Sequence, residues 1–497
     1  MDQQKGKLHN PARERPAARQ TPSISYGKAR ANRQGEPNTP VPKRLSQGRV
    51  KAPEGRQRTT PPGRKALSPE TEKRLSSREK TAAETRSAAG KRSAAETRSA
   101  AEIRPAAEIR PAAEVNSAVE EKPAAGIRTG MDRMLFTIII VLICFGSIMV
   151  FSASYADAQA RYGDSFFFIR KQIQWAAIGI VVMLFVSRLP PTTFRKWAIP
   201  SYIVTVGLLL VVLIIGVSGG GAQRWIAIGG LTFQPSELAK TTLVLMLAWY
   251  FSEHKDKVLD YSDKKNSLVR GVLIPFGFIG IICVLVMLEK HLSGLIIIAL
   301  IGVVVIFAAG MQFRWLAALG VLAGGGVTAL ALLTEYTKRR IIIWQNPQLY
   351  PLDGGWQTLQ GLYAIGSGGL FGLGLKNSRQ KFSYVSQPQN DFIFTIVCEE
   401  LGFIGAVAVI LLFTIFVWRG LTIATKAPDT FTSLATVGIV SKVAIQAILN
   451  IAVVTNSIPN TGISLPFFSY GGSSLVMLFM EMGILLSISR YSYQSSR

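Results

Sequence analysis

Ten long apolar segments between residues 134 and 490 restrict the fold of this chain more than any other feature. A helix needs roughly 20 predominantly apolar residues to cross the hydrocarbon core of a bilayer. We therefore expect an all-α, polytopic membrane protein with ten transmembrane helices. Because the first apolar run begins only at Met134, we expect no cleavable signal peptide. The predicted spans cover residues 134–154, 172–188, 197–216, 236–252, 269–288, 292–310, 312–334, 391–418, 432–455 and 471–490.

Residues 1–130 differ sharply in composition from the rest of the chain. The first 133 residues hold 29 Lys and Arg against 15 Asp and Glu, with almost no apolar runs. A unit Ala-Ala-Glu-Xaa-Arg recurs every six residues from Ala94, unlike the 3.6-residue period of a helix, and Pro105 and Pro111 interrupt any helix. We expect a disordered, basic, low-complexity cytoplasmic tail at 1–130, before a membrane domain at 131–497. The tail could bind anionic lipid or a partner, or be a solvated extension.

The distribution of Lys and Arg next to the spans predicts the orientation. Cytoplasmic loops carry an excess of these residues. Arg128 and Arg133 precede the first span, and the short loops 189–196, 253–268 and 419–431 are also basic. Ten spans would return the C-terminus to the side of the N-terminus. We therefore expect a multi-pass protein of the plasma membrane with both termini in the cytoplasm.

One connection, residues 335–390, is far longer than ordinary connections and is expected on the outer face. It carries a net charge of +4, and its only carboxylates before Asp391 are Glu335 and Asp353. Cations on the outer face oppose the topological bias, so an anionic ligand such as a phosphate would explain them. Contact with phospholipid headgroups is the alternative. The cations are Lys338, Arg339, Arg340, Lys376, Arg379 and Lys381.

Asp353 is the candidate catalytic residue of this loop. An Asp beside glycines, as here before Gly354 and Gly355, is commonly just a turn residue. A carboxylate among cations can also act as the general base for a sugar hydroxyl when the leaving group is a diphosphate. The apolar, glycine-rich run 359–375 predicts short or re-entrant helices in the same loop. Its glycines permit close approach of a ligand, or equally of a neighbouring helix.

A second polar stretch, from Gln223 to Lys240, carries an Arg, a Glu and a Lys to the edge of a predicted span. Ionisable groups there are costly and commonly functional. Glu237 and Lys240 are three residues apart, so they share a helix face and can pair. Arg224 and Trp225, in the preceding outer loop, could bind a phosphate and an isoprenoid or sugar face, although an interfacial Trp is common.

Other polar residues fall within or beside the spans. Glu399 and Glu400 lie inside a predicted span, so at least one should face a polar interior. We expect Lys442, early in the ninth span, to extend toward the cytoplasm. Ser469 and Ser473, in the last outer loop, can cap exposed amides at a helix start that could help to hold an anion. The sequence contains no Walker, Rossmann, zinc or Ser-His-Asp motif.

Three separated stretches resemble the FtsW/RodA/SpoVE family, also called the SEDS proteins. The motif order, the ten-span layout and the long outer loop between spans seven and eight fit that family. The motifs are most similar to FtsW and SpoVE of Gram-positive bacteria. The resemblance covers residues 134–490 and leaves the tail outside. The stretches are Arg224 to Lys240, Gln357 to Gly402 and Pro459 to Ser474.

The resemblance implies a peptidoglycan glycosyltransferase of cell division or spore cortex synthesis, which polymerises lipid II with inversion and releases undecaprenyl diphosphate. It also implies a catalytic Asp in the long outer loop. Many members place it directly before the loop proline, where this chain has Tyr350 before Pro351, so assigning Asp353 requires a small shift in register. Lys290, where many relatives have Pro, is a second departure. The expected substrate-binding residues are Arg224, Trp225, Glu237, Lys240, Arg339, Arg340, Lys376, Arg379, Lys381, Ser469 and Ser473.

The resemblance further implies a class B penicillin-binding protein as partner, contacting the outer loop and spans eight and nine. Other membrane proteins of the division or elongation machinery are expected as well, and no nucleic acid. A divalent cation, Mg²⁺ or Mn²⁺, could assist departure of the diphosphate, although the sequence shows no dedicated metal site. Two other functions remain open, a lipid II flippase or other transporter and a non-catalytic scaffold of the divisome. The sequence does not separate division, elongation and sporulation.

Overall fold

The computed structural model describes residues 130–492, except 220–221, 229–230, 260–267, 312–314, 316–334 and 383. Residues 1–129 of the predicted tail and nearly all of the predicted span 312–334 therefore lie outside the described residues. Backbone but not side-chain placement is described at a few further positions, which include Asp353.

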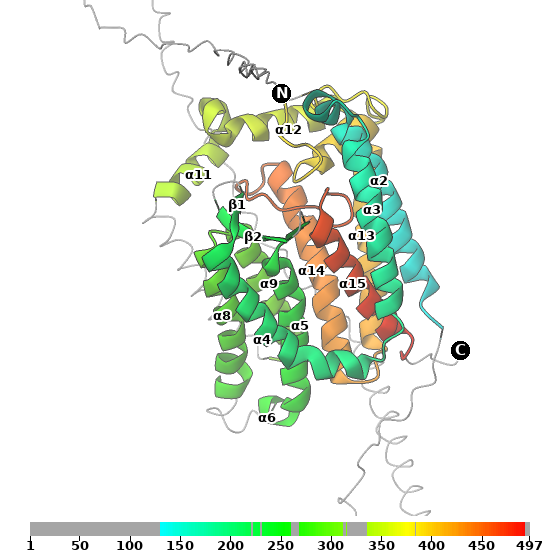
Figure 1. Ribbon diagram of the computed structural model, residues 1–497, viewed down its shortest axis with the longest axis vertical. Helices are drawn as coiled ribbons and strands as arrows, with labels where there is room; N and C mark the ends of the chain where they lie inside the picture. Colours follow the sequence, from blue (N-terminus) through cyan, green and yellow to red (C-terminus); the bar gives the residue numbers. More distant parts are fainter. Residues whose placement is uncertain are drawn as a thin grey trace, which may run out of the picture. The chain divides into compact units, whose positions relative to one another are not determined.

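Seven described helices are long and apolar enough to cross a membrane. Two more, α5 (Pro235–Glu253) and α9 (Leu292–Ala308), coincide with the predicted fourth and sixth spans. Nine of the ten predicted spans are thus helices among the described residues, which makes this a multi-pass membrane protein (Figure 1). The seven are α2 (Arg133–Tyr162), α3 (Phe167–Val186), α4 (Pro191–Ile215), η1 with α8 (Val269–Leu273 and Ile274–Leu288), α13 (Ile393–Thr425), α14 (Thr430–Val454) and α15 (Gly472–Ser489).

The helix boundaries follow local sequence signals. The Asp132 carboxylate accepts a hydrogen bond from the Leu135 amide and so caps the start of α2. Asp429 and Thr432 form a reciprocal capping box at the start of α14. Gly163 ends α2 with a φ of 66°, a left-handed conformation that glycine adopts without strain. These local signals set where α2 and α14 begin and where α2 ends.

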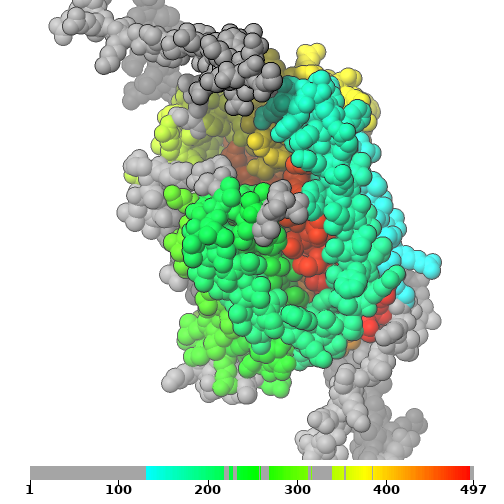
Figure 2. Space-filling view, in the orientation of Figure 1, coloured from blue at the N-terminus to red at the C-terminus, as the bar shows by residue number. Residues whose placement is uncertain are grey.

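The core lies where α14 contacts α5, α9 and α13, and where α15 packs along α3. Gly438 of α14 allows a close approach of the helices, because a Cβ there would collide with Val244 of α5 and Val305 of α9. The surrounding leucine, isoleucine, valine and phenylalanine side chains form one continuous buried cluster. In the view of Figure 2, α15 is visible between α3 on one side and α4 with the strands on the other.

The two ends of the bundle differ. The Asp132 amide donates to the Ser489 hydroxyl, and the Arg419 guanidinium bonds the Asp132 carboxylate at 2.5–3.1 Å, so α2 begins where α13 and α15 end. We call this the termini end. Tyr155, 23 residues or about 35 Å further along α2, donates to the carbonyl of Lys376 in the long loop. We call that side the loop end (Figure 1).

A small antiparallel sheet replaces the plain outer loop expected before α5. Its strands are β1 (Val217–Gly219), β2 (Ala222–Ile228) and β3 (Leu231–Phe233), in the order β1-β2-β3. Arg224 and Trp225 belong to β2, and Trp225 pairs with Val217 of β1. The sheet therefore fixes the backbone of Arg224 and Trp225 in the segment that precedes α5.

The long loop contains several short helices, one of which covers part of the apolar run 359–375 where short helices were expected. They are α11 (Glu335–Gln345), the turns η2 (Pro347–Leu349) and η3 (Pro351–Gly355), and α12 (Trp356–Ser367). Figure 1 shows α11 and α12 lying across the loop end. The Trp344 indole donates to the Asn456 carbonyl, and the Trp356 indole to the Tyr384 carbonyl, so the loop is attached to the α14–α15 connection and to itself.

The glycines after α12 pack against a neighbouring helix, which was one of the two roles expected. A Cβ on Gly368 would collide with the Cys398 carbonyl of α13, and one on Gly372 with the Glu400 backbone. Gly402 kinks α13 at φ 66° and ψ −163°, a conformation that is essentially restricted to glycine. The Phe403 amide beyond this kink donates to the Gly369 carbonyl.

Replacing Gly402 by Ala should destabilise the protein by about 2–3 kcal/mol, because an L-residue is strained there and its Cβ would meet the backbone of Gly372 and Leu370. Thermal unfolding of the detergent-purified protein measures this loss. Gly366→Ala is the matched control, since a Cβ there meets nothing within 4 Å. Equal melting temperatures for the two variants would contradict the packing role of Gly402.

Candidate functional site

Two ion pairs meet within the helix bundle. The Lys240 amine lies 2.7 Å from Glu237 Oε1 on α5, and the Lys442 amine of α14 lies 2.6 Å from Glu481 Oε1 of α15. The Thr241 hydroxyl of α5 donates to the same Glu481 oxygen. We call these five residues the central cluster. The pairing expected for Glu237 and Lys240 is confirmed, whereas the expected extension of Lys442 to the cytoplasm is wrong, because a carboxylate on α15 binds its amine inside the bundle.

A small cavity of about 30 Å³ lies beside this cluster. Glu237 and Lys442 both line it, together with Gln446 and serines of the α14–α15 connection. Ser469 is one of them, and its hydroxyl accepts from the Leu465 amide and donates to the Asn390 carbonyl. The Ser469 hydroxyl therefore joins two parts of the α14–α15 connection and bonds this connection to the segment just before α13. The space is large enough for one or two water molecules.

Arg224 stands among buried ionisable groups near the start of α5. It acts electrostatically on Glu289, which follows α8, on His291, which precedes α9, and on Asp391, which precedes α13. Nδ1 of His291 lies 3.2 Å from the Ser236 hydroxyl, and burial with nearby Arg224 and Lys240 lowers the pKa of His291 to about 3. His291 is therefore neutral at physiological pH. The sequence alone indicated no function for His291, because its contact with Ser236 and its nearness to Arg224 arise only in the fold.

Glu289 is the least compensated of these groups. Its side chain is 1% exposed, and within the described part of the chain neither carboxylate oxygen has a hydrogen-bond partner. Burial raises the pKa of Glu289 to about 7, while the Arg224 guanidinium opposes that rise. The folded protein therefore favours the neutral carboxyl, whereas an unfolded Glu ionises near pH 4.3.

Glu289→Gln should raise the melting temperature strongly at pH 8 and only slightly at pH 5. Because the folded pKa is raised, the stability contributed by Glu289 is full below about pH 4.3 and is lost as the pH rises toward 7. Glutamine is neutral at every pH, so the variant should gain about 1–3 kcal/mol at pH 8 relative to the native protein. Thermal unfolding at both pH values measures the difference. A shift independent of pH would contradict the assignment.

Several other predicted residues reach the loop end from separate elements. The Arg340 guanidinium of α11 donates to the Asn460 carbonyl at 3.1 Å, so α11 contacts the α14–α15 connection. Arg339 lies beside it on the same helix and is exposed. Ser473, in the first turn of α15, has its hydroxyl buried without a hydrogen bond to any described residue. Trp225 is half-buried in β2.

A second polar group joins the long loop to α2 and α13. The Lys381 amine bonds Glu400 Oε1 at 2.7 Å, with both side chains fully buried. Ser152 of α2 donates to the other oxygen of Glu400, and the Ser378 hydroxyl and Arg379 amide donate to Glu399. Both glutamates thus face a polar interior, which confirms the expectation for at least one. Lys381 was expected among ligand-binding cations, but its contacts here are structural.

Lys376 and Arg379 remain exposed beside this group. The Lys376 amine lies 4.8 Å from the ring centroid of Phe151 on α2, a cation–π contact, and its backbone amide donates to Ser152. The Arg379 side chain is accessible while its amide is bonded to Glu399. These two cations could contact an anion without breaking a buried pair.

Asp353 lies in the π-helical turn η3, directly before α12. Its backbone is thereby placed on the long loop, but its side chain lies outside the described part of the structure. Gly354 follows with a φ of 97°, so the chain turns sharply there, as the neighbouring glycines predict.

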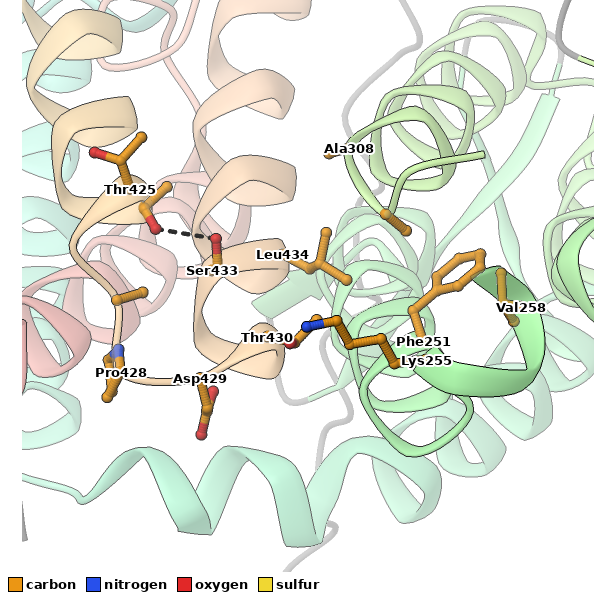
Figure 3. Close-up of a pocket in the computed structure, with 13 residues that line it drawn as sticks. Phe251, Lys255, Val258, Ala308, Thr425, Pro428, Asp429, Thr430, Ser433 and Leu434 are labelled. Atoms are coloured by element: carbon orange, nitrogen blue, oxygen red, sulfur yellow. Dashed lines mark hydrogen bonds between the residues drawn. The ribbon is translucent and has the colours of Figure 1, made fainter. Parts of the chain in front are cut away.

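A larger cavity of about 460 Å³ opens at the termini end (Figure 3). It is lined by the ends of α5, α9 and α13 and the start of α14, with Lys255 pointing toward Thr430. The Ser433 hydroxyl donates to the Ala424 carbonyl beside it at 2.9 Å. Its charged lining residues, Lys255 and Asp429, are both exposed, and Asp429 is occupied as a helix cap.

No group of three or more His, Cys, Asp or Glu side chains is placed to hold a metal ion among the residues that the structure describes. We therefore assign no ligand set for a divalent cation and derive no step through one.

Comparison with known proteins identifies the family. Residues 132–494 match the family model described as "Cell cycle protein", which groups FtsW, RodA and SpoVE. The chain is 41% identical over 367 residues to stage V sporulation protein E of Bacillus subtilis, covering 73% of this chain and 98% of that protein. It is 36% identical over 363 residues to a probable peptidoglycan glycosyltransferase FtsW of Geobacter, covering 72% and 97%.

Solved structures agree with this result. A chain from a structure described as "Structural coordination of polymerization and crosslinking by a peptidoglycan synthase complex" is similar with a TM-score of 0.62. The two are 26% identical, and the match covers 73% of this chain and 99% of the other. In each of these comparisons about a quarter of this chain remains unmatched, a share that corresponds to the predicted tail.

Proposed function

Since the chain belongs to the FtsW/RodA/SpoVE family, we propose that it is a peptidoglycan glycosyltransferase that polymerises lipid II at the outer face of the plasma membrane. The observation that carries the proposal is the buried Glu237–Lys240 pair, whose Glu237 lines a cavity beside the α14–α15 connection, the segment that Arg340 of the long loop contacts. That loop lies at the end of the bundle opposite Asp132 and Ser489. The names of the relatives and the synthase complex support the same activity.

The reaction requires three tasks from the protein, which are accepting a proton, stabilising the charge of the leaving group and orienting the substrate. Asp353 accepts the proton of the acceptor 4-hydroxyl, whose oxygen forms the new bond to the anomeric carbon of the donor. The bond from that carbon to the diphosphate breaks, and its electrons leave with undecaprenyl diphosphate. Cations stabilise the departing charge, because positioned cations act most strongly where negative charge develops. We assign this task to Arg224, Arg339, Arg340, Lys376, Arg379 and Lys240.

The remaining candidate residues orient the substrate. Glu237 fixes the Lys240 amine through their 2.7 Å ion pair. Trp225 offers a flat apolar face to a sugar ring or isoprenoid, and Ser473 offers a hydroxyl in the first turn of α15. Ser469 contributes through the connection before α15, which its two hydrogen bonds hold in place. Lys381 contributes indirectly, by holding the loop against α13 through Glu400.

The orientation and the partner belong to the same proposal. The termini end faces the cytoplasm, because the basic loops 189–196 and 419–431 join helices there. Residues 1–130 form a cytoplasmic tail. A class B penicillin-binding protein, which would cross-link the new glycan, contacts the long loop and the exposed apolar face of α13 that includes Phe403 and Leu411.

Purified protein incubated with its partner penicillin-binding protein and lipid II should produce long glycan strands, resolved by gel electrophoresis. The partner alone is the control and should leave lipid II unpolymerised. Lipid II that stays monomeric in the presence of both proteins would contradict the proposal.

A transporter of lipid II is the second candidate, and the Lys442–Glu481 pair favours it. Lys442 lies 12 residues, about 18 Å, from either end of α14, so polar groups reach the middle of the membrane. Below it, however, Gly438 packs tightly on Val244 and Val305, which closes the path in this conformation. Movement of lipid II between the leaflets of protein-containing vesicles, without polymerisation, would establish transport instead.

A further inference from the structure

The geometry points to a role for Lys442 and Glu481 beyond joining two helices. We propose that they are positioning residues, which hold the Glu237–Lys240 pair in the geometry that substrate requires. This inference rests on the proposed function, since it gives the Glu237–Lys240 pair a part in lipid II polymerisation. Neither residue was expected at the site from the sequence.

The two ion pairs also act on each other through their charges. Glu237 and Lys240 form one ion pair at 2.7 Å, and Lys442 and Glu481 form the other at 2.6 Å. Lys442 also attracts Glu237, with which it lines the cavity, and Glu481 attracts Lys240. Lys442 also repels Lys240, so the Lys442–Glu481 pair acts on both charges of the Glu237–Lys240 pair.

Burial makes these attractions strong. Lys240, Lys442 and Glu481 are 1%, 2% and 0% exposed, so water does little to screen them. The Glu237 side chain is 13% exposed and is the most accessible of the four. Of the four side chains, Glu237 is therefore the one that a substrate group could contact, and Lys442 lines the same cavity. We call Lys442 and Glu481 the inner pair and Glu237 and Lys240 the outer pair. The position of the inner pair thus limits where the outer pair can move.

Hydrogen bonds fix the inner pair in turn. The Thr241 hydroxyl donates to Glu481 Oε1, the oxygen that also binds Lys442. Thr241 directly follows Lys240 on α5, so the same carboxylate bonds the helix that carries the outer pair. Glu481 is therefore attached to α5 as well as to α14. If the Lys442–Glu481 pair only joined α14 to α15, the contact of Glu481 with Thr241 of α5 would not be needed.

Exchanging the charges of Lys442 and Glu481 distinguishes a positioning role from a role in joining α14 to α15 only. In Lys442→Glu combined with Glu481→Lys, an ion pair still joins α14 and α15, but the residue at 442 now repels Glu237 instead of attracting it. We expect a folded protein whose polymerisation rate at saturating lipid II falls at least tenfold, because a misplacement of about 1 Å can cost roughly 100-fold. Polymerisation at the wild-type rate would overturn the proposal.

The matched control exchanges Arg195 and Glu253, an exposed ion pair between α4 and α5 at 2.7 Å. Exposed pairs contribute little, so this exchange should leave both rate and melting temperature unchanged. Should the inner exchange fail to fold, Lys442→Gln combined with Glu481→Gln removes both charges without burying an unpaired one. It should fold and polymerise at least tenfold more slowly, whereas Lys442→Arg, which keeps the charge, should retain more than half of the rate.

The outcomes distinguish this inference from the proposed function. An active wild-type protein with equally active exchanged and neutralised variants would overturn the positioning role alone. A wild-type protein that leaves lipid II unpolymerised in the presence of its partner would overturn the proposed function, and this inference with it.

Discussion

Asp353→Asn is expected to lower the rate of lipid II polymerisation by about 10²- to 10⁴-fold, the usual contribution of a general base. The asparagine side chain has nearly the same shape but cannot accept the proton of the acceptor hydroxyl. Asp353 lies in the turn before α12 and the substitution keeps the size of its side chain, so the melting temperature should stay within the error of the measurement. Polymerisation of lipid II by the purified variant with its partner measures the effect.

Glu335→Gln is the control, since it neutralises the other carboxylate of the long loop. It should polymerise lipid II normally. An Asp353→Asn protein with the wild-type rate would show that another group acts as the base. Growth of a deletion strain restored by an inactive Asp353→Asn allele would instead indicate a scaffold.

Lys381→Met is expected to destabilise the protein by about 3–5 kcal/mol, the largest effect on folding that we predict. Removing one partner of a buried ion pair leaves the other charge without compensation, and Glu400 is fully buried. The loss would also free the loop from α13, because the Ser378 and Arg379 contacts to Glu399 adjoin the same site. Thermal unfolding in detergent would detect it.

Two variants test the cause of this loss. Lys376→Met removes a neighbouring but exposed cation and should cost less than about 1 kcal/mol. Adding Glu400→Gln to Lys381→Met removes the unpaired charge and should recover part of the stability. If Lys381→Met melts at the wild-type temperature, the pair with Glu400 is not what holds the loop.

The helices and the family could be predicted from sequence because their signals are local. Each span needs only a run of apolar residues, and Pro235 or Asp429 marks a boundary within a few positions. The Glu237–Lys240 pair was also accessible, since three residues on one helix place both side chains on the same face.

Contacts between distant segments could not be predicted in this way. Lys442 looks like a residue near a helix end until α15 places Glu481 2.6 Å from its amine. Lys381 looks like a free loop cation, although a glycine-rich turn brings it against Glu400. In both cases the partner lies on another helix, and neither composition nor spacing reveals which helices become neighbours.

The claim on which the account depends is that the long loop faces away from the cytoplasm. Single cysteines introduced in place of Lys376 and Lys426, after replacement of the three native cysteines, test it directly. Both positions are exposed, and they lie at the loop end and the termini end. In intact cells a membrane-impermeant maleimide should label the cysteine at 376 and should reach the one at 426 only after permeabilisation. Labelling at 426 but not at 376 would contradict the account.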